Sequence, residues 1–143
     1  MSPYKNLKMT SRLYSGITDT DIDMVLQQTG LTPYKDEKIS SFSMRMKQRF
    51  GIATALISKP RLIVLDEPTN GLDIDGLLLL RKTIQEISSH SGVSFVISSH
   101  HISELEKLCN RFCFLINGTA SLYAAGTEPL EDVYVRKVEV AGR

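Results

Sequence analysis

The first part of the chain carries apolar residues at the spacing of amphipathic helices. Three segments show this spacing: residues 6–14, residues 19–29, which are followed by Gly30, and a segment that begins after Ser43. In the third segment the apolar residues recur at intervals of four, three and four, which predicts one buried stripe. The stripe comprises Met46, Phe50, Ala53 and Ile57. Residues 1–58 are therefore expected to form a helical subdomain.

After Pro60 the pattern changes to strand, helix, strand. A continuous apolar run at residues 62–65 is typical of a strand buried on both faces of a parallel sheet. Residues 73–89 show helical periodicity, and residues 94–98 read as the next strand. This alternation predicts an α/β fold with a parallel sheet and right-handed crossovers.

The remainder is expected to add a short helix at residues 101–108 and a terminal hairpin. The hairpin strands, residues 112–116 and 120–123, flank Asn117-Gly118, a typical two-residue turn. We assign residues 59–127 to the α/β portion and residues 128–143 to a C-terminal tail.

The composition is that of an ordinary globular domain. Of 143 residues, 42% are hydrophobic and 23% are charged, and 17 basic against 16 acidic residues give a net charge of +1. No dense basic stripe appears, so nucleic acid is not an expected partner. No apolar run approaches the length of a membrane span. The two cysteines, Cys109 and Cys113, fit neither a zinc nor a redox spacing and are expected to be buried apolar residues.

The strand at residues 62–65 ends in two adjacent carboxylates, Asp66 and Glu67, followed by a tight turn that reaches Asp73. Ligands of open α/β sheets gather at this end of a strand. Because neighbouring strand residues point to opposite sides, one carboxylate can hold a metal ion through water while the other orients or deprotonates a nucleophile. That division suits phosphoryl transfer to water. The alternative is that both residues simply begin a solvated loop.

At these residues the sequence resembles the ATP-binding cassette (ABC) proteins. Residues 62–67 look like the family's Walker B strand, and residues 68–73 resemble its D-loop. Residues 41–49 are similar to the signature motif of exporters of peptide antibiotics and related drugs, and residues 95–100 resemble the strand with the switch histidine. The resemblance implies a partial P-loop NTPase fold, in which a helical signature subdomain precedes a truncated parallel sheet.

The resemblance also implies roles for single residues. Glu67 would polarise the attacking water, His100 would contact the γ-phosphate, and Asp66 would hold Mg²⁺ through water. The signature residues would reach the nucleotide on a second cassette in a head-to-tail dimer. The positions that the resemblance assigns to nucleotide and Mg²⁺ binding are Ser43, Met44, Arg45, Met46, Asp66 and Asp73.

Three of these assignments have alternatives. Ser43 stands where it would cap the following helix, and Asp73 either communicates between the two sites of a dimer or simply caps the helix it begins. Arg45 occupies the place of the second signature glycine, where a long side chain is expected to obstruct contact between backbone and phosphate. Its guanidinium could instead pair with phosphate.

A phosphate-binding P-loop needs the pattern Gly-x4-Gly-Lys-Ser/Thr, and this chain contains none. The one Gly-x4-Gly spacing, from Gly71 to Gly76, continues into leucines. We therefore expect the later portion of a cassette, which takes ATP and Mg²⁺ only with a P-loop supplied by other residues or by a partner.

The resemblance favours part of the nucleotide-binding subunit of an ABC exporter. Such a subunit works with a transmembrane permease, and it lies in the cytoplasm at the inner face of the membrane, which it contacts only through that partner. The alternative is a non-catalytic remnant that acts as a docking module. A DNA-repair or chromosome-structure ATPase is disfavoured by residues 69–73 and by the absence of long heptad arms.

Overall fold

The computed structural model describes residues 1–142. The chain forms two compact units, Met1–Ser98 and Ser99–Arg143. The finer division expected at residues 58 and 127 stays a prediction.

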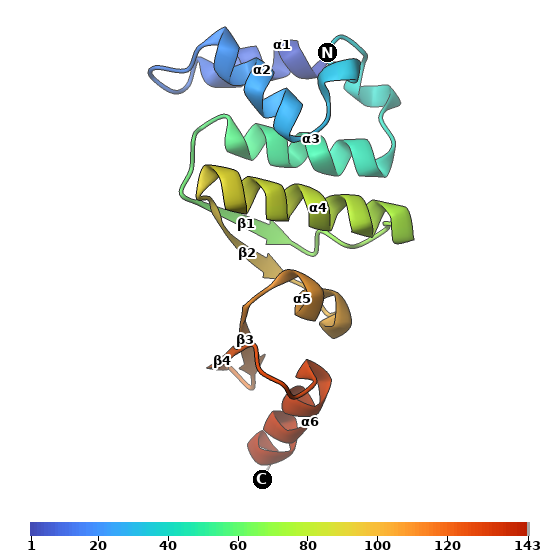
Figure 1. The fold of residues 1–143 in the computed structure, drawn as a ribbon, viewed down its shortest axis with the longest axis vertical. Helices are drawn as coiled ribbons and strands as arrows, with labels where there is room; N and C mark the ends of the chain where they lie inside the picture. The colour runs from blue at the N-terminus through green and yellow to red at the C-terminus, as the bar shows by residue number, and fades with distance from the viewer. Residues whose placement is uncertain (143) are drawn as a thin grey trace. The chain divides into compact units, whose positions relative to one another are not determined.

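The first unit begins with three helices, α1 (Pro3–Ser11), α2 (Asp19–Gln28) and α3 (Met44–Leu56). Two short 3-10 turns, η1 (Thr32–Tyr34) and η2 (Ile39–Ser41), join α2 to α3. The helix α3 packs against α1 and α2, as Figure 1 shows. The almost fully buried side chains of this helical layer are Leu7, Ile22, Leu26, Leu31, Ala53 and Ile57.

The start of α1 differs from its expected position. The helix covers Pro3–Ser11 rather than residues 6–14, because Ser2 caps it and a proline occupies its first position. The Ser2 hydroxyl accepts a hydrogen bond from the backbone N–H of Lys5 at 3.5 Å. The helix α2 begins where predicted, since Thr18 and Asp21 form a reciprocal capping box.

The expected stripe on α3 is confirmed at its C-terminal half only. Ala53 and Ile57 are buried, whereas Met46 and Phe50 are half-buried. Ile52 and Leu56 complete the buried face. The N-terminal half of α3, which holds the signature residues, is the more exposed end.

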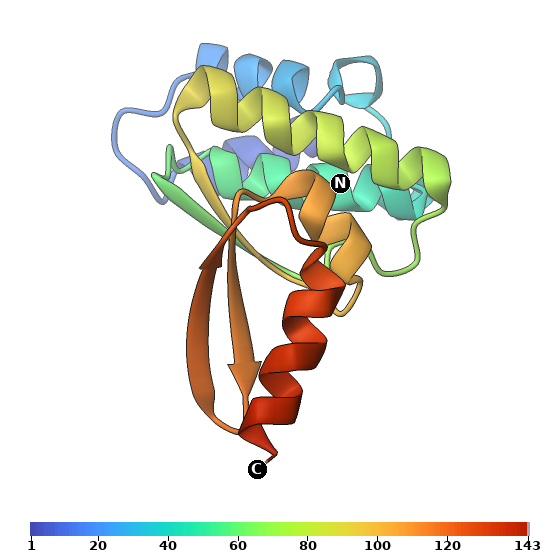
Figure 2. The same ribbon diagram turned by 60° about the horizontal axis from the view of Figure 1, so that its bottom comes forward.

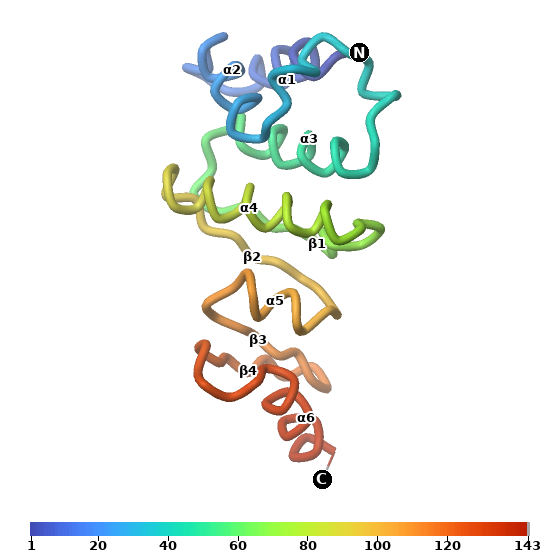
Figure 3. The backbone as a smooth tube through the Cα atoms, turned by 45° about the vertical axis from the view of Figure 1, so that its right-hand side comes forward, coloured from blue at the N-terminus to red at the C-terminus, as the bar shows by residue number. Residues whose placement is uncertain are grey.

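The α/β part of the first unit comprises β1 (Leu62–Asp66), α4 (Ile74–Ser91) and β2 (Ser94–Ser98). The two strands are parallel, with Leu62 opposite Ser94 and Asp66 opposite Ser98. The crossover helix α4 packs on β2 and against α3, an arrangement that Figures 1 and 3 show from two sides. The predicted order strand, helix, parallel strand is thus confirmed.

The apolar run of β1 is typical of a strand buried on both faces, but in the described residues β1 is buried on one face only. Ile63 is 4% exposed, but its neighbours Leu62 and Val64 are 52% and 69% exposed, and Val96 on β2 is 53% exposed. Side chains alternate between the two faces of a strand, and helices cover one face of this two-stranded sheet in the described residues. The apolar run therefore supplies one core residue and an exposed apolar face.

This alternation gives a prediction for stability. Ile63→Ala is expected to reduce the free energy of unfolding of the chain by about 2–4 kcal/mol, because it leaves a cavity in the core. Val64→Ala, one residue further on, is expected to change it by less than about 0.5 kcal/mol, because that side chain is largely exposed. Urea unfolding followed by circular dichroism measures both, and equal losses would contradict the one-sided burial of β1.

The second unit comprises α5 (Ile102–Leu108), the hairpin of β3 (Arg111–Ile116) and β4 (Thr119–Ala124), and α6 (Leu130–Ala141). Asn117 and Gly118 both have positive φ, as the predicted two-residue turn requires. Figure 2 shows α6 lying along the hairpin. The core of this unit is formed by Phe112, Phe114, Leu130 and Val133. Part of the expected tail is therefore a packed helix.

The sequence predicts that both cysteines are buried, but neither side chain is fully buried in the structure. Cys109 is half-buried and packs beside that core, and burial raises the pKa of its thiol. Cys113 is exposed, because it alternates with Phe112 and Phe114 along β3 and so points to the other face of the hairpin.

Candidate functional site

The carboxylate pair lies at the tip of β1, where the sequence predicts it. Asp66 is the last residue of the strand, and Glu67 has a left-handed backbone with φ of 45°. The hydroxyl of Ser98 joins both residues: it donates to Asp66 Oδ1 at 2.5 Å and accepts from the backbone N–H of Glu67 at 2.9 Å. The tips of β1 and β2 are therefore linked, and the exposed Asp66 carboxylate faces solvent.

Ser98 is one site residue that sequence reasoning missed. The sequence did contain a signal for this contact. Ser98 ends the predicted second strand, and two parallel strands that end together place their last residues side by side. A hydroxyl there can donate to a carboxylate and accept from an amide at the same time.

The turn that follows Glu67 is compact and leads directly into α4. Pro68 and Thr69 are buried, and Gly71 has φ of 73°, a conformation that favours glycine. Asp73 caps α4, since its Oδ1 accepts a hydrogen bond from the backbone N–H of Gly76 at 3.0 Å. The predicted capping role of Asp73 is confirmed, and its role in a dimer stays a prediction.

The signature residues occupy the start of α3. Ser43 caps this helix by accepting a hydrogen bond from the backbone N–H of Met46 at 3.3 Å, which confirms the alternative role that the sequence offered. Ser43 is exposed, and Met44 is 53% exposed. An exposed helix N-terminus offers free N–H groups to an anion, so capping and nucleotide contact are compatible.

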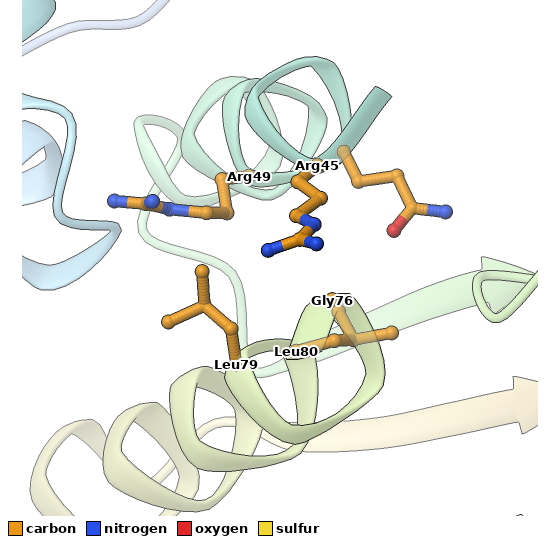
Figure 4. A pocket seen from close by; sticks show the side chains of 6 residues that line it. Arg45, Arg49, Gly76, Leu79 and Leu80 are labelled. Atoms are coloured by element: carbon orange, nitrogen blue, oxygen red, sulfur yellow. The ribbon is translucent and has the colours of Figure 1, made fainter. Parts of the chain in front are cut away.

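Arg45 does not extend into solvent from this helix end. Its guanidinium forms an ion pair with the Asp73 carboxylate, and Asp75 Oδ2 lies 3.8 Å from the same nitrogen. The hydrogen bond from Arg45, together with that from the Gly76 amide, holds the pKa of Asp73 below its ordinary value. Figure 4 shows the Arg45 side chain between α3 and α4. Its expected obstruction of phosphate and its possible pairing with phosphate both stay predictions.

Two more residues of the signature segment, Gln48 and Arg49, make specific contacts that sequence reasoning did not anticipate. Gln48 donates from Nε2 to the backbone carbonyl of Pro68. Arg49 donates from Nε to the carbonyl of Thr29 at 2.5 Å, and partial burial lowers its pKa. Both residues line a small pocket between α3 and α4, which Figure 4 shows. The lining residues are Arg45, Gln48, Arg49, Gly76, Leu79 and Leu80.

His100 belongs to the second unit, at its N-terminal end. Its ring lies beside that of His101, with centroids 4.1 Å apart, and the backbone N–H of His101 donates to the Ser99 hydroxyl at 3.0 Å. The helix α5 begins at the next residue, Ile102. Because Asp66 and Glu67 lie in the first unit, joint action of these residues with His100 stays a prediction.

The carboxylate donors suit an outer contact to Mg²⁺ rather than a closed metal cage. In residues 1–142, no group of three or more His, Cys, Asp or Glu side chains lies close enough together to hold a metal ion. Mg²⁺ commonly keeps several waters and takes one or two carboxylates plus substrate phosphates, and the exposed Asp66 carboxylate at the strand tip fits that mode. The same part of the chain has no helix with the length and apolar character that a bilayer crossing demands.

The sequence was compared with known proteins. The profile of the family described as ABC transporter matches residues 2–70. The ABC transporter ATP-binding protein YhcH of Bacillus subtilis is 38% identical over 118 residues, which are 82% of this chain and 39% of that protein. The lantibiotic transport ATP-binding protein SrtF of Streptococcus pyogenes is 37% identical over 140 residues, which are 96% of this chain and 60% of that protein. The chain thus spans between about two fifths and three fifths of the length of these relatives.

Solved structures agree on the fold. The structure of cbiO1 from Clostridium perfringens, part of the ABC transporter complex cbiONQ, superposes with a TM-score of 0.80 at 24% identity over 99% of this chain and 56% of that one. The ADP conformation of MJ1267, an ATP-binding cassette of an ABC transporter, superposes with a TM-score of 0.75 at 21% identity over 87% of this chain and 49% of that one. The partial ABC ATPase fold that the sequence implied is confirmed.

Proposed function

The chain belongs to the family of ABC transporter ATP-binding proteins, and from this premise we propose that it forms part of the nucleotide-binding subunit of an exporter. In this role it would couple ATP binding and hydrolysis to transport. The observation that carries the proposal is the carboxylate pair at the tip of β1, which Ser98 joins to the tip of β2. The similarity to SrtF, a lantibiotic transport protein, supports an exporter of peptide-like substrates.

The two carboxylates are proposed to divide the chemistry. A Mg²⁺ ion would supply charge neutralisation at the phosphates, and the Asp66 carboxylate would hold it through water. Glu67 would orient the attacking water and accept its proton. Ser98 would keep Asp66 in place through its hydroxyl and fix the backbone of Glu67. His100 would contact the γ-phosphate.

The exposed start of α3 is proposed to contact the nucleotide that is bound to a second cassette. The backbone N–H groups of Ser43, Met44 and Arg45 at this helix end would face the phosphates bound to a second cassette in a head-to-tail dimer. Asp73 would lie at the same dimer interface. The phosphates themselves would be gripped by a P-loop outside these 143 residues. A transmembrane permease would hold the assembly at the cytoplasmic face of the membrane.

A chimaera tests the proposal. The chain replaces the 140-residue segment of SrtF that it matches, so that the relative supplies its remaining residues. Purified chimaera is expected to hydrolyse ATP, whereas the 143-residue chain alone is expected to show no turnover and an ATP affinity at least about tenfold weaker, because it has no P-loop amides or lysine. Calorimetry measures the affinity and phosphate release measures the turnover.

The outcome also separates this proposal from the alternative of a docking module. A folded chimaera that binds ATP but does not hydrolyse it, while parental SrtF does under the same conditions, would favour the non-catalytic alternative. Micromolar ATP affinity of the 143-residue chain alone would contradict the proposed dependence on a P-loop from other residues.

A further inference from the structure

The turn from Pro68 to Asp73 is held at both ends by one helix. At its first residue, Gln48 Nε2 donates to the Pro68 carbonyl, and at its last residue the Arg45 guanidinium pairs with the Asp73 carboxylate. Arg45 and Gln48 are three residues apart on α3, so they project from the same side of the helix. Two side chains of the signature helix thus contact the turn that joins β1 to α4.

The first turn of α4 leaves room for the Arg45 side chain at Gly76. This glycine is buried and has an ordinary helical backbone, so the backbone does not require it. A Cβ at this position would lie 3.2 Å from Arg45 Cγ and 3.0 Å from Asp73 Oδ1. Glycine weakens a helix, and here its absent side chain leaves room for the stem of Arg45, which lies between α3 and α4 next to Gly76 in Figure 4.

The charges around Arg45 favour this position. Asp75 places a second carboxylate 3.8 Å from the guanidinium nitrogen that pairs with Asp73. Asp73 also accepts the Gly76 amide, so its carboxylate is fixed by the helix it caps when it meets the guanidinium. An arginine is suited to such a contact, because its planar group can serve more than one oxygen and keeps its charge.

We propose that Arg45 is a positioning residue, which acts with Gln48 to fasten the turn that carries Asp73 to the signature helix. A displacement of the start of α3 would then be transmitted to Asp73 through a direct side-chain contact. In this role Arg45 is neither a ligand of phosphate nor an obstruction to it. Its consequence for hydrolysis rests on the proposed function, whereas the contact itself can be tested on the chain alone.

The first test uses amide chemical shifts of the 143-residue chain. Arg45→Ala is expected to shift the amide signals of residues 69–76, which lie more than twenty residues further along the sequence. Lys47→Ala, which removes an exposed cation from the same helix, is expected to leave them unchanged. Asp73→Asn should shift the same signals while preserving the helix cap, since asparagine is also a good capping residue.

The double variant Arg45→Ala/Asp73→Asn should shift those signals by less than the sum of the two single changes, because both remove one contact. Arg45→Lys should recover part of the wild-type pattern. Circular dichroism confirms that each variant is folded. Amide shifts confined to the neighbours of residue 45, or shifts in the double variant that are fully additive, would overturn the proposal.

The second test measures kinetics in the chimaera. Arg45→Ala is expected to lower kcat about threefold to tenfold while KM for ATP stays within about twofold. This combination indicates that the turn carrying Asp73 is positioned differently, rather than that ground-state binding of ATP is lost. A higher KM with unchanged kcat would identify a phosphate ligand, and faster hydrolysis by Arg45→Gly would identify an obstruction; either result overturns the proposal. If wild-type chimaera is inactive while the amide shifts appear as expected, the positioning contact stands and the proposed function fails.

Discussion

Glu67→Gln is expected to lower ATP hydrolysis by the SrtF chimaera by about 10²- to 10³-fold while leaving ATP affinity within about twofold. The amide has nearly the shape of the carboxylate, so it preserves packing, but it cannot accept a proton from the attacking water. The position of Glu67 supports this role, because its left-handed backbone follows directly on Asp66 and its N–H is held by Ser98. Phosphate release and ATP titration of the same preparations measure the two quantities.

A control variant shows whether the loss is specific. Glu37→Gln makes the same chemical change at an exposed position between α2 and α3 and is expected to leave hydrolysis within about twofold. Steady-state hydrolysis retained by Glu67→Gln at more than about a tenth of the wild-type rate would show that another group accepts the proton. A parallel loss of ATP affinity would instead point to a damaged binding site.

Local sequence signals predicted several elements of the fold, one of which contributes to the site. The strand β2 has the predicted bounds, and Asn117-Gly118 forms the predicted turn, because both depend on residue types within a few positions. The burial of β1 was not predictable in the same way. An apolar run indicates how many faces a strand can bury, whereas Val64 shows that neighbouring elements decide how many it does bury in this chain.

The side-chain contacts that hold the site together could not be predicted from the sequence motifs. Ser98 meets Asp66 across 32 positions, and Arg45 meets Asp73 across 28, so each contact exists only after β2 pairs with β1 or α3 packs on α4. The sequence presented Arg45 as a departure from a glycine and suggested roles toward phosphate. It could not indicate that Gly76, on the next helix, leaves the space in which an arginine stem fits.

His100→Ala is expected to lower kcat of the chimaera by about 10²-fold, and His101→Ala by less than about twofold. Both histidines are exposed and their rings lie side by side, so either change removes the same ring contact. The pair therefore separates a role in the reaction from a role in local packing. Only His100 occupies the position at the end of the motif formed by residues 95–100.

The two variants are best measured together under saturating ATP, where kcat reports the step after binding. Equal and small effects would show that neither imidazole reaches the γ-phosphate, and the catalytic role would rest on Glu67 alone. Equal and large effects would indicate that the stacked rings act as a packing unit at the start of α5. A large effect of His101→Ala alone would mean that the register of the switch motif is shifted by one residue. A loss confined to His100→Ala would support a role of its imidazole in hydrolysis, because the ring contact between the two histidines is removed in either variant.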